Sequence, residues 1–155
     1  MFQGLFEVMA ALLNEELGLE ELLGLCLKVG EVNVSVMASL DSAHATLLGT
    51  PEPSKVNRTP VEGKCILISG HDLCVLKQLL EYIDQVGEPI NVYTHCEMLP
   101  AFGYPELKKH KNLVGNFGGA WYDQCKDFRD FPGPILLTTN CLIQPQPSYK
   151  KRLFT

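Results

Sequence analysis

The sequence predicts an α/β fold: N-terminal helices followed by an open, parallel, Rossmann-like sheet of about four strands with flanking helices. Two patterns lead to this prediction. Up to about residue 44, apolar residues recur every three or four positions, as they do along one face of a helix. From Gly63 onward, short apolar runs alternate with helical stretches, which is typical of right-handed crossovers in a parallel sheet.

Residues 1–48 are predicted to be a helical segment, the end of a helical domain. An apolar series at steps of three and four runs from Leu19 to Leu40, with charged residues between its members, and it predicts an amphipathic helix. A shorter helical run, 5–13, precedes it. Because two helices alone cannot bury such faces, we expect them to pack on the following region or on sequence outside this chain.

Residues 49–62 are predicted to be a linker, because Pro51 and Pro53 stand one residue apart and force an extended path. Residues 63–155 then form the α/β domain, which we expect to be incomplete at its C-terminal end. Its helices are predicted from Leu73 to near Gly87 and over residues 119–131. Its four strands are predicted at residues 64–68, 90–94, 112–115 and 134–139.

Charge argues against a nucleic-acid partner. The formal net charge is -5 and the pI is near 5.3, so no basic stripe is available to neutralise phosphates. The two basic runs, 108–111 and 150–152, are expected to be a solvated face and a tail.

Nothing in the sequence is interpreted as a membrane span: the apolar stretch from Met9 to Leu13 is too short, and acidic residues follow it. The N-terminus lacks the basic start and cleavage site of a signal peptide, so we expect a cytoplasmic protein without a membrane partner. In that reducing compartment the six cysteines, which form no C-x-x-C pair, are not expected to be a disulfide framework. Most of them are expected to be small buried hydrophobic residues.

Candidate ligands follow three of the predicted strands. His71 comes after the first strand, Glu97 after the second and Cys141 after the fourth. In an open parallel sheet, ligands bind beyond the carboxyl ends of the strands. An imidazole, a carboxylate and a thiol gathered there are side chains that bind transition metals, and the mixture favours an iron cluster that meets a small substrate.

Each candidate also has a structural interpretation. His71 could cap the following helix, Glu97 could be a solvated loop carboxylate, and Cys141 could be a buried structural thiol. Two further histidines compete as ligands. His95 stands close enough to contact the ligands from behind, whereas His110 lies in a basic run and is expected to face solvent.

The glycine-rich run 115–120 lies between a strand and a helix, where a phosphate could bind at the helix N-terminus. It does not match G-x-G-x-x-G, and no acidic residue stands clearly at the expected later position. We therefore favour a tight strand-to-helix turn over a nucleotide site.

Four segments in order resemble the hybrid-cluster (prismane, hydroxylamine reductase) family, and the similarity extends back into the long helix to cover nearly the whole chain. These segments are residues 63–73, 91–108, 113–121 and 133–141.

The resemblance implies an iron–sulfur–oxygen hybrid cluster bound between this α/β domain and a further domain, with His71, Glu97 and Cys141 at ligand positions. It implies reduction of hydroxylamine to ammonia and water, and nitric oxide reduction is also associated with the family. The implied partners are a small nitrogenous substrate, an electron donor and the remaining domains. From its position, His95 is a candidate catalytic residue as a proton relay.

Several departures limit what the resemblance implies for this chain alone. Phe102 stands where the family usually has histidine, and Cys96 where it usually has glycine. The family's cysteine-rich motif for a second cluster is absent, as are the later cysteines and the glutamate that complete the hybrid cluster. We therefore expect a fragment, a truncated product or a degenerate copy that binds little cluster and is inactive by itself.

Three other interpretations stay open at this point. The chain could be a non-catalytic remnant or interaction domain that keeps the fold without the cluster. A nickel–iron carbon monoxide dehydrogenase is a distant relative of the architecture, but the thiol-poor ligand set with Glu97 argues against it. A nucleotide-binding Rossmann module is disfavoured because the glycine fingerprint is missing.

Overall fold

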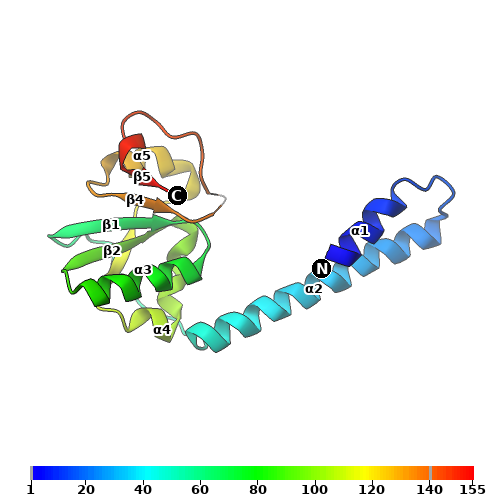
Figure 1. Ribbon diagram of the computed structural model, residues 1–155, viewed down its shortest axis with the longest axis horizontal. Coiled ribbons are helices and arrows are strands. Elements are labelled where there is room, and N and C mark those ends of the chain that lie inside the picture. The colour runs from blue at the N-terminus through cyan, green and yellow to red at the C-terminus, as the bar shows by residue number, and fades with distance from the viewer. Residues whose placement is uncertain (1, 140) are drawn as a thin grey trace. The chain divides into compact units, whose positions relative to one another are not determined.

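The computed structural model of the protein describes residues 2–139 and 141–155, which fall into two compact units (Figure 1). The first unit is Met1–Leu47 and the second is Leu48–Thr155. The first is helical and the second is an α/β sandwich, in agreement with the predicted order of helices followed by a sheet.

Two helices make the first unit. They are α1 (Phe2–Ala11) and α2 (Leu19–Leu48), so the long predicted helix continues well beyond Leu40. The helices contact each other through an ion pair between Lys28 and Glu7. No residue of α1 is buried and many apolar side chains of both helices are exposed, which leaves their apolar faces unpartnered within this unit.

The expectation that no segment resembles a membrane span does not hold for α2. This helix has 30 residues, and an 18-residue window of it reaches a mean hydropathy of 1.4 with none of the window buried. It is long and apolar enough to cross a bilayer. Length and composition are weak evidence, because core helices of soluble proteins and signal sequences meet the same criterion.

The sheet is open and entirely parallel, as predicted, with the strand order β3-β2-β1-β4-β5. The strands are β1 (Lys64–Ser69), β2 (Ile90–His95), β3 (Leu113–Phe117), β4 (Ile135–Leu137) and β5 (Leu153–Phe154). Four of them match the predicted strands. The fifth strand, β5, pairs with β4. It was not predicted, because a strand of two residues is too short to show an apolar periodicity.

Alternating side chains of the strands enter two cores, one on each face of the sheet. Ile68 and Val92 belong to the core beneath α3, whereas the adjacent Leu67 and Tyr93 belong to the core beneath α5. Figure 1 shows α3 and α5 on opposite sides of the strands. The helical elements of this unit are α3 (Leu73–Val86), η1 (Cys96–Gly103), α4 (Pro105–Lys108), η2 (Trp121–Asp123), α5 (Gln124–Asp130) and η3 (Lys150–Arg152).

Local capping explains the bounds of α3. The Asp72 carboxylate accepts hydrogen bonds from the backbone N–H groups of Cys74 at 2.8 Å and Val75 at 3.0 Å, so it caps the N-terminus. Gly87 closes the helix in the left-handed conformation, with φ 71°. The predicted stop near this glycine is confirmed.

The helix predicted over residues 119–131 is present, but it begins later than predicted. Ala120 is extended, the chain then makes the 3-10 turn η2, and the α-helix begins only at Gln124. The reason is the turn before it. Gly118 has φ 80° and lies so close to Asp127 that a Cβ would be 2.4 Å from Oδ2, and this tight turn leaves the next residues outside helical geometry.

The stretch predicted as a linker runs in extended form beside the edge strand β3. The carbonyl oxygen of Asn57 accepts the backbone N–H of Asn116 at 2.9 Å. Further along, the N–H of Val61 donates to the Tyr93 hydroxyl at 2.7 Å. The first bond covers part of an otherwise free strand edge, and the second anchors the segment to β2. The domain boundaries 1–48, 49–62 and 63–155 stay a prediction.

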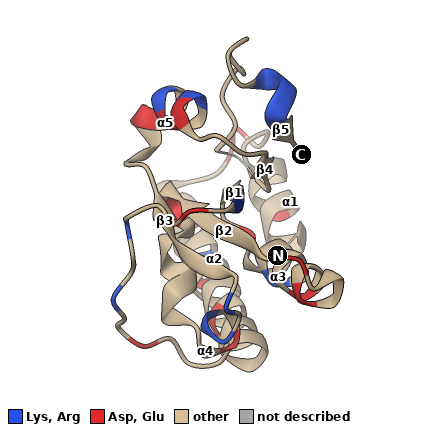
Figure 2. Ribbon diagram, turned by 90° about the vertical axis from the view of Figure 1, so that its left-hand side faces the viewer, with Lys and Arg blue, Asp and Glu red and all other residues tan. Residues whose placement is uncertain are grey.

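The exposure of several polar residues differs from expectation. His110, predicted to face solvent, is 6% exposed because the turn after α4 directs its Nδ1 to Asp84 Oδ2 at 2.5 Å. The prediction that most cysteines are buried is also wrong: of the six, only Cys141 is buried. Charged residues colour separate short segments of the ribbon, including the basic run just before β5 (Figure 2).

Candidate metal centre

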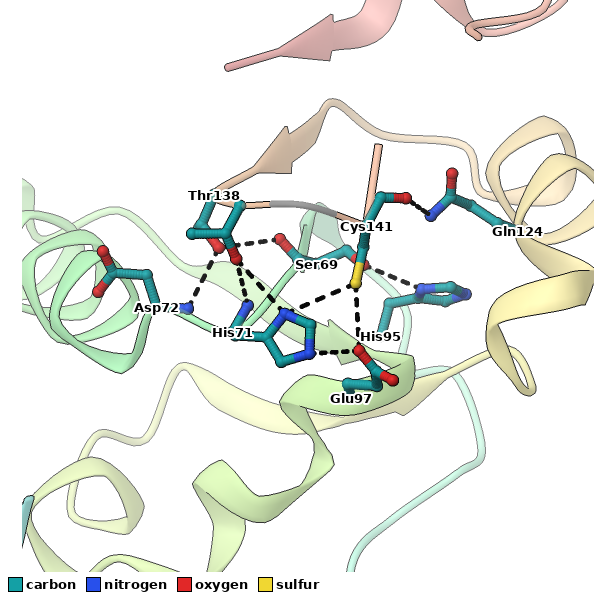
Figure 3. A network of polar contacts seen from close by, with 9 residues as sticks. Ser69, His71, Asp72, His95, Glu97, Gln124, Thr138 and Cys141 are labelled. Carbon is teal, nitrogen blue, oxygen red and sulfur yellow. Dashed lines mark hydrogen bonds and ion pairs between the residues drawn. The ribbon is translucent and has the colours of Figure 1, made fainter. Parts of the chain in front are cut away.

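The three predicted ligand residues come together at the carboxyl edge of the sheet (Figure 3). The ends of the central strands are level, because Ser69 at the end of β1 is in register with His95 on β2 and with Leu137 on β4. His71, Glu97 and Cys141 follow these strand ends and therefore emerge on one rim.

One possible ligand atom from each of the three residues lies within 4.8 Å of the others. The Cys141 thiol donates to Glu97 Oε2 at 3.3 Å, and its Sγ lies 3.7 Å from His71 Nδ1. The other ring nitrogen of His71, Nε2, pairs with the same Glu97 oxygen. His71 and Glu97 are exposed whereas Cys141 is only 3% exposed, so the cluster is closed on the sulfur side and open on the other.

The surroundings of Cys141 keep its thiol protonated at neutral pH. Burial, followed by the hydrogen bond to Glu97, raises the pKa of Cys141 to about 11. A metal ion binds the thiolate, so binding at this sulfur has to displace the proton.

Contacts between the loops after β1 and β4 hold His71 in place. Gly70 has φ 117°, and a Cβ there would lie 2.9 Å from the backbone nitrogen of Thr139. This close approach lets the Thr139 hydroxyl accept the backbone N–H of His71 at 2.9 Å. The Thr138 hydroxyl accepts the N–H of Asp72 at 3.3 Å. Only glycine permits both the backbone angle and this proximity.

His95 is fully buried behind the cluster. Its Nδ1 lies 3.1 Å from Ser69 Oγ and its Nε2 lies 3.1 Å from Asp127 Oδ2. Burial lowers the pKa of His95, and the Asp127 carboxylate opposes that change. Both ring nitrogens are thus occupied, and among the described residues no hydrogen bond joins His95 to the three candidate ligands. Its role as a proton relay stays a prediction.

Sequence reasoning missed Gln124 and Asp127, two buried polar residues of α5. Gln124 Nε2 donates to the carbonyl oxygen of Cys141 at 2.6 Å, and Asp127 holds His95. They stand three positions apart beside the apolar Phe128, and polar residues at this spacing on a core-facing helical side were the available signal.

A surface hollow of about 410 Å³ opens beside Glu97. Its lining residues are Cys96, Glu97, Gly119, Ala120, Trp121 and Tyr122. Cys96 has φ 50°, the one positive φ among the described residues other than glycine. The glycine-rich turn lines the hollow opposite Glu97. Its Gly119 N–H donates to Asp127 Oδ2 at 2.9 Å, so this amide stabilises the turn, in agreement with the predicted tight strand-to-helix turn.

The chemistry of the donors fits a transition metal. A buried sulfur suits a soft, sulfide-rich iron site, while an imidazole and a carboxylate suit iron that keeps an open position. Second contacts orient the donors, as is usual around metal ligands: Thr139 holds the loop of His71, and Gln124 holds the backbone of Cys141.

Comparison with known proteins identifies the family. The sequence profile of the Prismane/CO dehydrogenase family matches residues 1–155. The chain belongs to this family. The family resemblance noted in the sequence is thereby confirmed.

Similar proteins of this family are named hydroxylamine reductase. The protein from Actinobacillus succinogenes is 57% identical over 138 residues, which are 88% of this chain and 25% of that protein. The protein from Acidiphilium cryptum is 50% identical over 152 residues, 98% of this chain and 27% of that protein. The protein from Burkholderia lata is 48% identical over 155 residues, all of this chain and 28% of that protein. The chain therefore spans about a quarter of the length of these relatives.

Proposed function

We propose that this chain is a segment of a hydroxylamine reductase-like oxidoreductase and supplies three ligands, His71, Glu97 and Cys141, to a hybrid iron–sulfur–oxygen cluster. The observation that carries the proposal is the convergence of these three donors within 4.8 Å at the carboxyl edge of the sheet. The relatives' name and the family match support the reaction class. Sequence outside this chain would supply the remaining ligands.

When bound, the cluster supplies electrons and an open coordination position, and hydroxylamine plus two electrons and two protons then yields ammonia and water. The residues of this chain prepare that site. Cys141 would bind as the thiolate and release its proton to solvent, because the Glu97 oxygen that accepts this proton in the metal-free site would itself become a ligand. His71 presents an imidazole whose exposed side leaves room for a small substrate, and nitric oxide is a second candidate substrate of the same size class.

The implied partners follow from the same site. They are a small nitrogenous substrate, a redox protein that donates electrons, and the remaining domains of the whole protein, with a cytoplasmic location. The exposed apolar side chains of α1 and α2 offer surface for those domains to cover.

A second candidate is a non-catalytic remnant or interaction domain that retains the fold. It is favoured by the ligand count among the described residues, because three protein ligands cannot complete a four-iron cluster. On either hypothesis residues 1–155 alone should turn over no hydroxylamine. Stoichiometric iron together with turnover in this chain alone would contradict that expectation.

The ligand assignment is tested in the whole protein, the full reading frame, produced without oxygen. Cys141→Ala should abolish the electron paramagnetic resonance signal of the hybrid cluster and lower the iron content. Cys65→Ala is the matched control, since this half-buried thiol lies outside the donor group and should cost only about 1 kcal/mol of packing stability. Equal iron and equal signals in both variants would refute the assignment.

A further inference from the structure

One short helix, α5, reaches the backbone segments that carry all three candidate ligands. Its Gln124 and Asp127 lie three positions apart and are 1% and 9% exposed. Resting on the metal site proposed above, we propose that both are positioning residues of that site: they orient the ligand-bearing loops without binding the metal.

The Asp127 arm acts through a buried chain of hydrogen bonds. Asp127 Oδ2 lies 3.1 Å from His95 Nε2, and a carboxylate can only accept, so this nitrogen carries the hydrogen. His95 Nδ1, the unprotonated nitrogen of the neutral ring, then accepts the hydroxyl of Ser69 at 3.1 Å. The chain thus joins α5 to the last residue of β2 and to the last residue of β1.

Those two strand ends are where the ligands begin. Ser69 precedes His71 by two residues, and His95 precedes Glu97 by two residues. Fixing the distance between the strand ends therefore restricts the distance between the imidazole and the carboxylate. The same Asp127 oxygen also accepts the N–H of Gly119, so its position is set from a third side.

The Gln124 arm holds the third ligand. Its Nε2 donates to the carbonyl oxygen of Cys141 at 2.6 Å, which fixes the backbone from which the thiol projects (Figure 3). The other end of the same amide, Oε1, is buried and has no partner among the described residues. An unpaired buried acceptor is destabilising, so the contribution of this side chain lies in its bond to Cys141.

Core packing fixes the position of α5, so its side chains can set the positions of the ligand-bearing loops. Phe128 is fully buried and packs edge-on against the His95 ring, with centroids 5.1 Å apart, and against Tyr149 at 5.5 Å. Because the network is excluded from water, its members have no alternative partners there, and its geometry is transmitted to the loops.

A second histidine–carboxylate pair, in which the histidine is buried and the carboxylate is exposed, provides a control. His110 Nδ1 contacts Asp84 Oδ2, and His110 precedes β3, so this pair lies at the amino edge of the same sheet, opposite the candidate site. Asp84→Ala should lower stability without affecting the metal site. If Asp127 had a merely structural role, Asp127→Ala, like Asp84→Ala, would leave metal affinity and the relative exchange of the ligand loops unchanged.

The test compares the 155-residue chain with Asp127→Ala, Asp127→Asn, Gln124→Ala and Asp84→Ala in two measurements. In the metal-free protein, hydrogen exchange is followed in peptides that carry His71, Glu97 and Cys141. Relative to the strand peptides, Asp127→Ala should raise exchange about tenfold around His71 and Glu97, and Gln124→Ala around Cys141 only. Asp127→Asn keeps an acceptor oxygen and should restore most of the protection.

In the second measurement, Co²⁺ is titrated and the thiolate-to-cobalt absorption is recorded. Gln124→Ala and Asp127→Ala should weaken cobalt affinity about 10- to 100-fold, whereas Asp84→Ala should bind as the parent does. Equal affinity and equal loop exchange in all variants, or an equal effect of Asp84→Ala, would overturn the inference. If Asp127→Ala does not fold, Gln124→Ala decides by itself.

The two proposals fail in different ways. A parent chain that binds no cobalt, while exchange still rises in the named loops, would refute the metal site and leave the positioning role of α5 intact. A parent chain that binds cobalt with variants that bind equally well would leave the metal site intact and refute the positioning role.

Discussion

Cys141 is set apart from the other five cysteines by its burial and by its carboxylate neighbour. Both raise its pKa to about 11, which holds the proton on sulfur through the neutral range. A thiol in this condition is a poor nucleophile and a good ligand only when a metal replaces its proton. Because oxidants react with the thiolate, the protonated thiol of Cys141 should resist oxidation while no metal is bound.

This proton makes metal affinity depend on pH. Binding to the thiolate releases one proton wherever the pH is below 11, so affinity should rise about tenfold per pH unit between pH 7 and 9. Co²⁺ titrations of the 155-residue chain at several pH values measure this slope. Cys141→Ser should lose the thiolate absorption altogether, and a parent affinity independent of pH would contradict the prediction.

Cys96 is a second residue whose conformation sets it apart. Its φ of 50° is a left-handed conformation that costs most residues about 1 kcal/mol and costs glycine almost nothing. We expect Cys96→Gly to leave the free energy of unfolding unchanged or to raise it by about 0.5 kcal/mol. Urea unfolding of parent and variant measures this difference.

The control is the same substitution in an ordinary helical position. Cys74 is exposed in the first turn of α3, and Cys74→Gly should lower the free energy of unfolding by about 0.5–1 kcal/mol. A larger loss for Cys96→Gly than for Cys74→Gly would show that the Cys96 side chain stabilises the fold.

At the scale of elements, the C-terminal end of α5 depends on a residue far along the chain. The Arg152 guanidinium donates to the carbonyl oxygens of Phe128 at 3.0 Å and Gly133 at 2.7 Å, and also to that of Phe131. The guanidinium pairs with the free carbonyl groups at the end of α5, and Arg152 directly precedes β5. It therefore links the helix end to this edge strand. The basic run 150–152, predicted to be a solvated tail, therefore includes one structural residue.

Loss of this cap should loosen α5. Arg152→Ala removes several hydrogen bonds from a charged donor and should lower the free energy of unfolding by about 2 kcal/mol. Arg152→Lys should recover only part of it, because an ammonium cannot reproduce the planar fork. Arg129→Ala is the control, since this residue forms an exposed pair with Asp130 and should change stability little. Equal effects at the two arginines would contradict the capping role.

At the scale of the whole molecule, the buried His95 couples stability to pH. Burial lowers its pKa in the folded state below the ordinary value of 6.5, so the unfolded chain takes up a proton that the folded chain does not. Stability should therefore fall as the pH drops below about 6.5. The carboxylates with lowered pKa values act only in more acidic solution, because their ordinary values lie at or below 4.5.

Replacement of the imidazole isolates this effect. His95→Gln should lower stability at pH 7 and should also flatten the dependence of the free energy of unfolding on pH between 7 and 5. Urea unfolding of the metal-free parent and variant at pH 7 and pH 5 measures how the free energy of unfolding of each depends on pH. A variant that keeps the full slope of the parent would assign the pH dependence to other groups.

The sequence by itself determined the order of the elements and the rim on which the candidate ligands lie. Strand and helix periodicity is local, and parallel strands necessarily deliver the residues after them to one edge, so His71, Glu97 and Cys141 followed from short segments. Tertiary structure alone decided the pairing of β5, the late start of α5 and the inward turn of His110. The bonds from α5 to His95 and Cys141 join residues far apart in the chain, and only packing of the folded protein sets which distant polar groups meet.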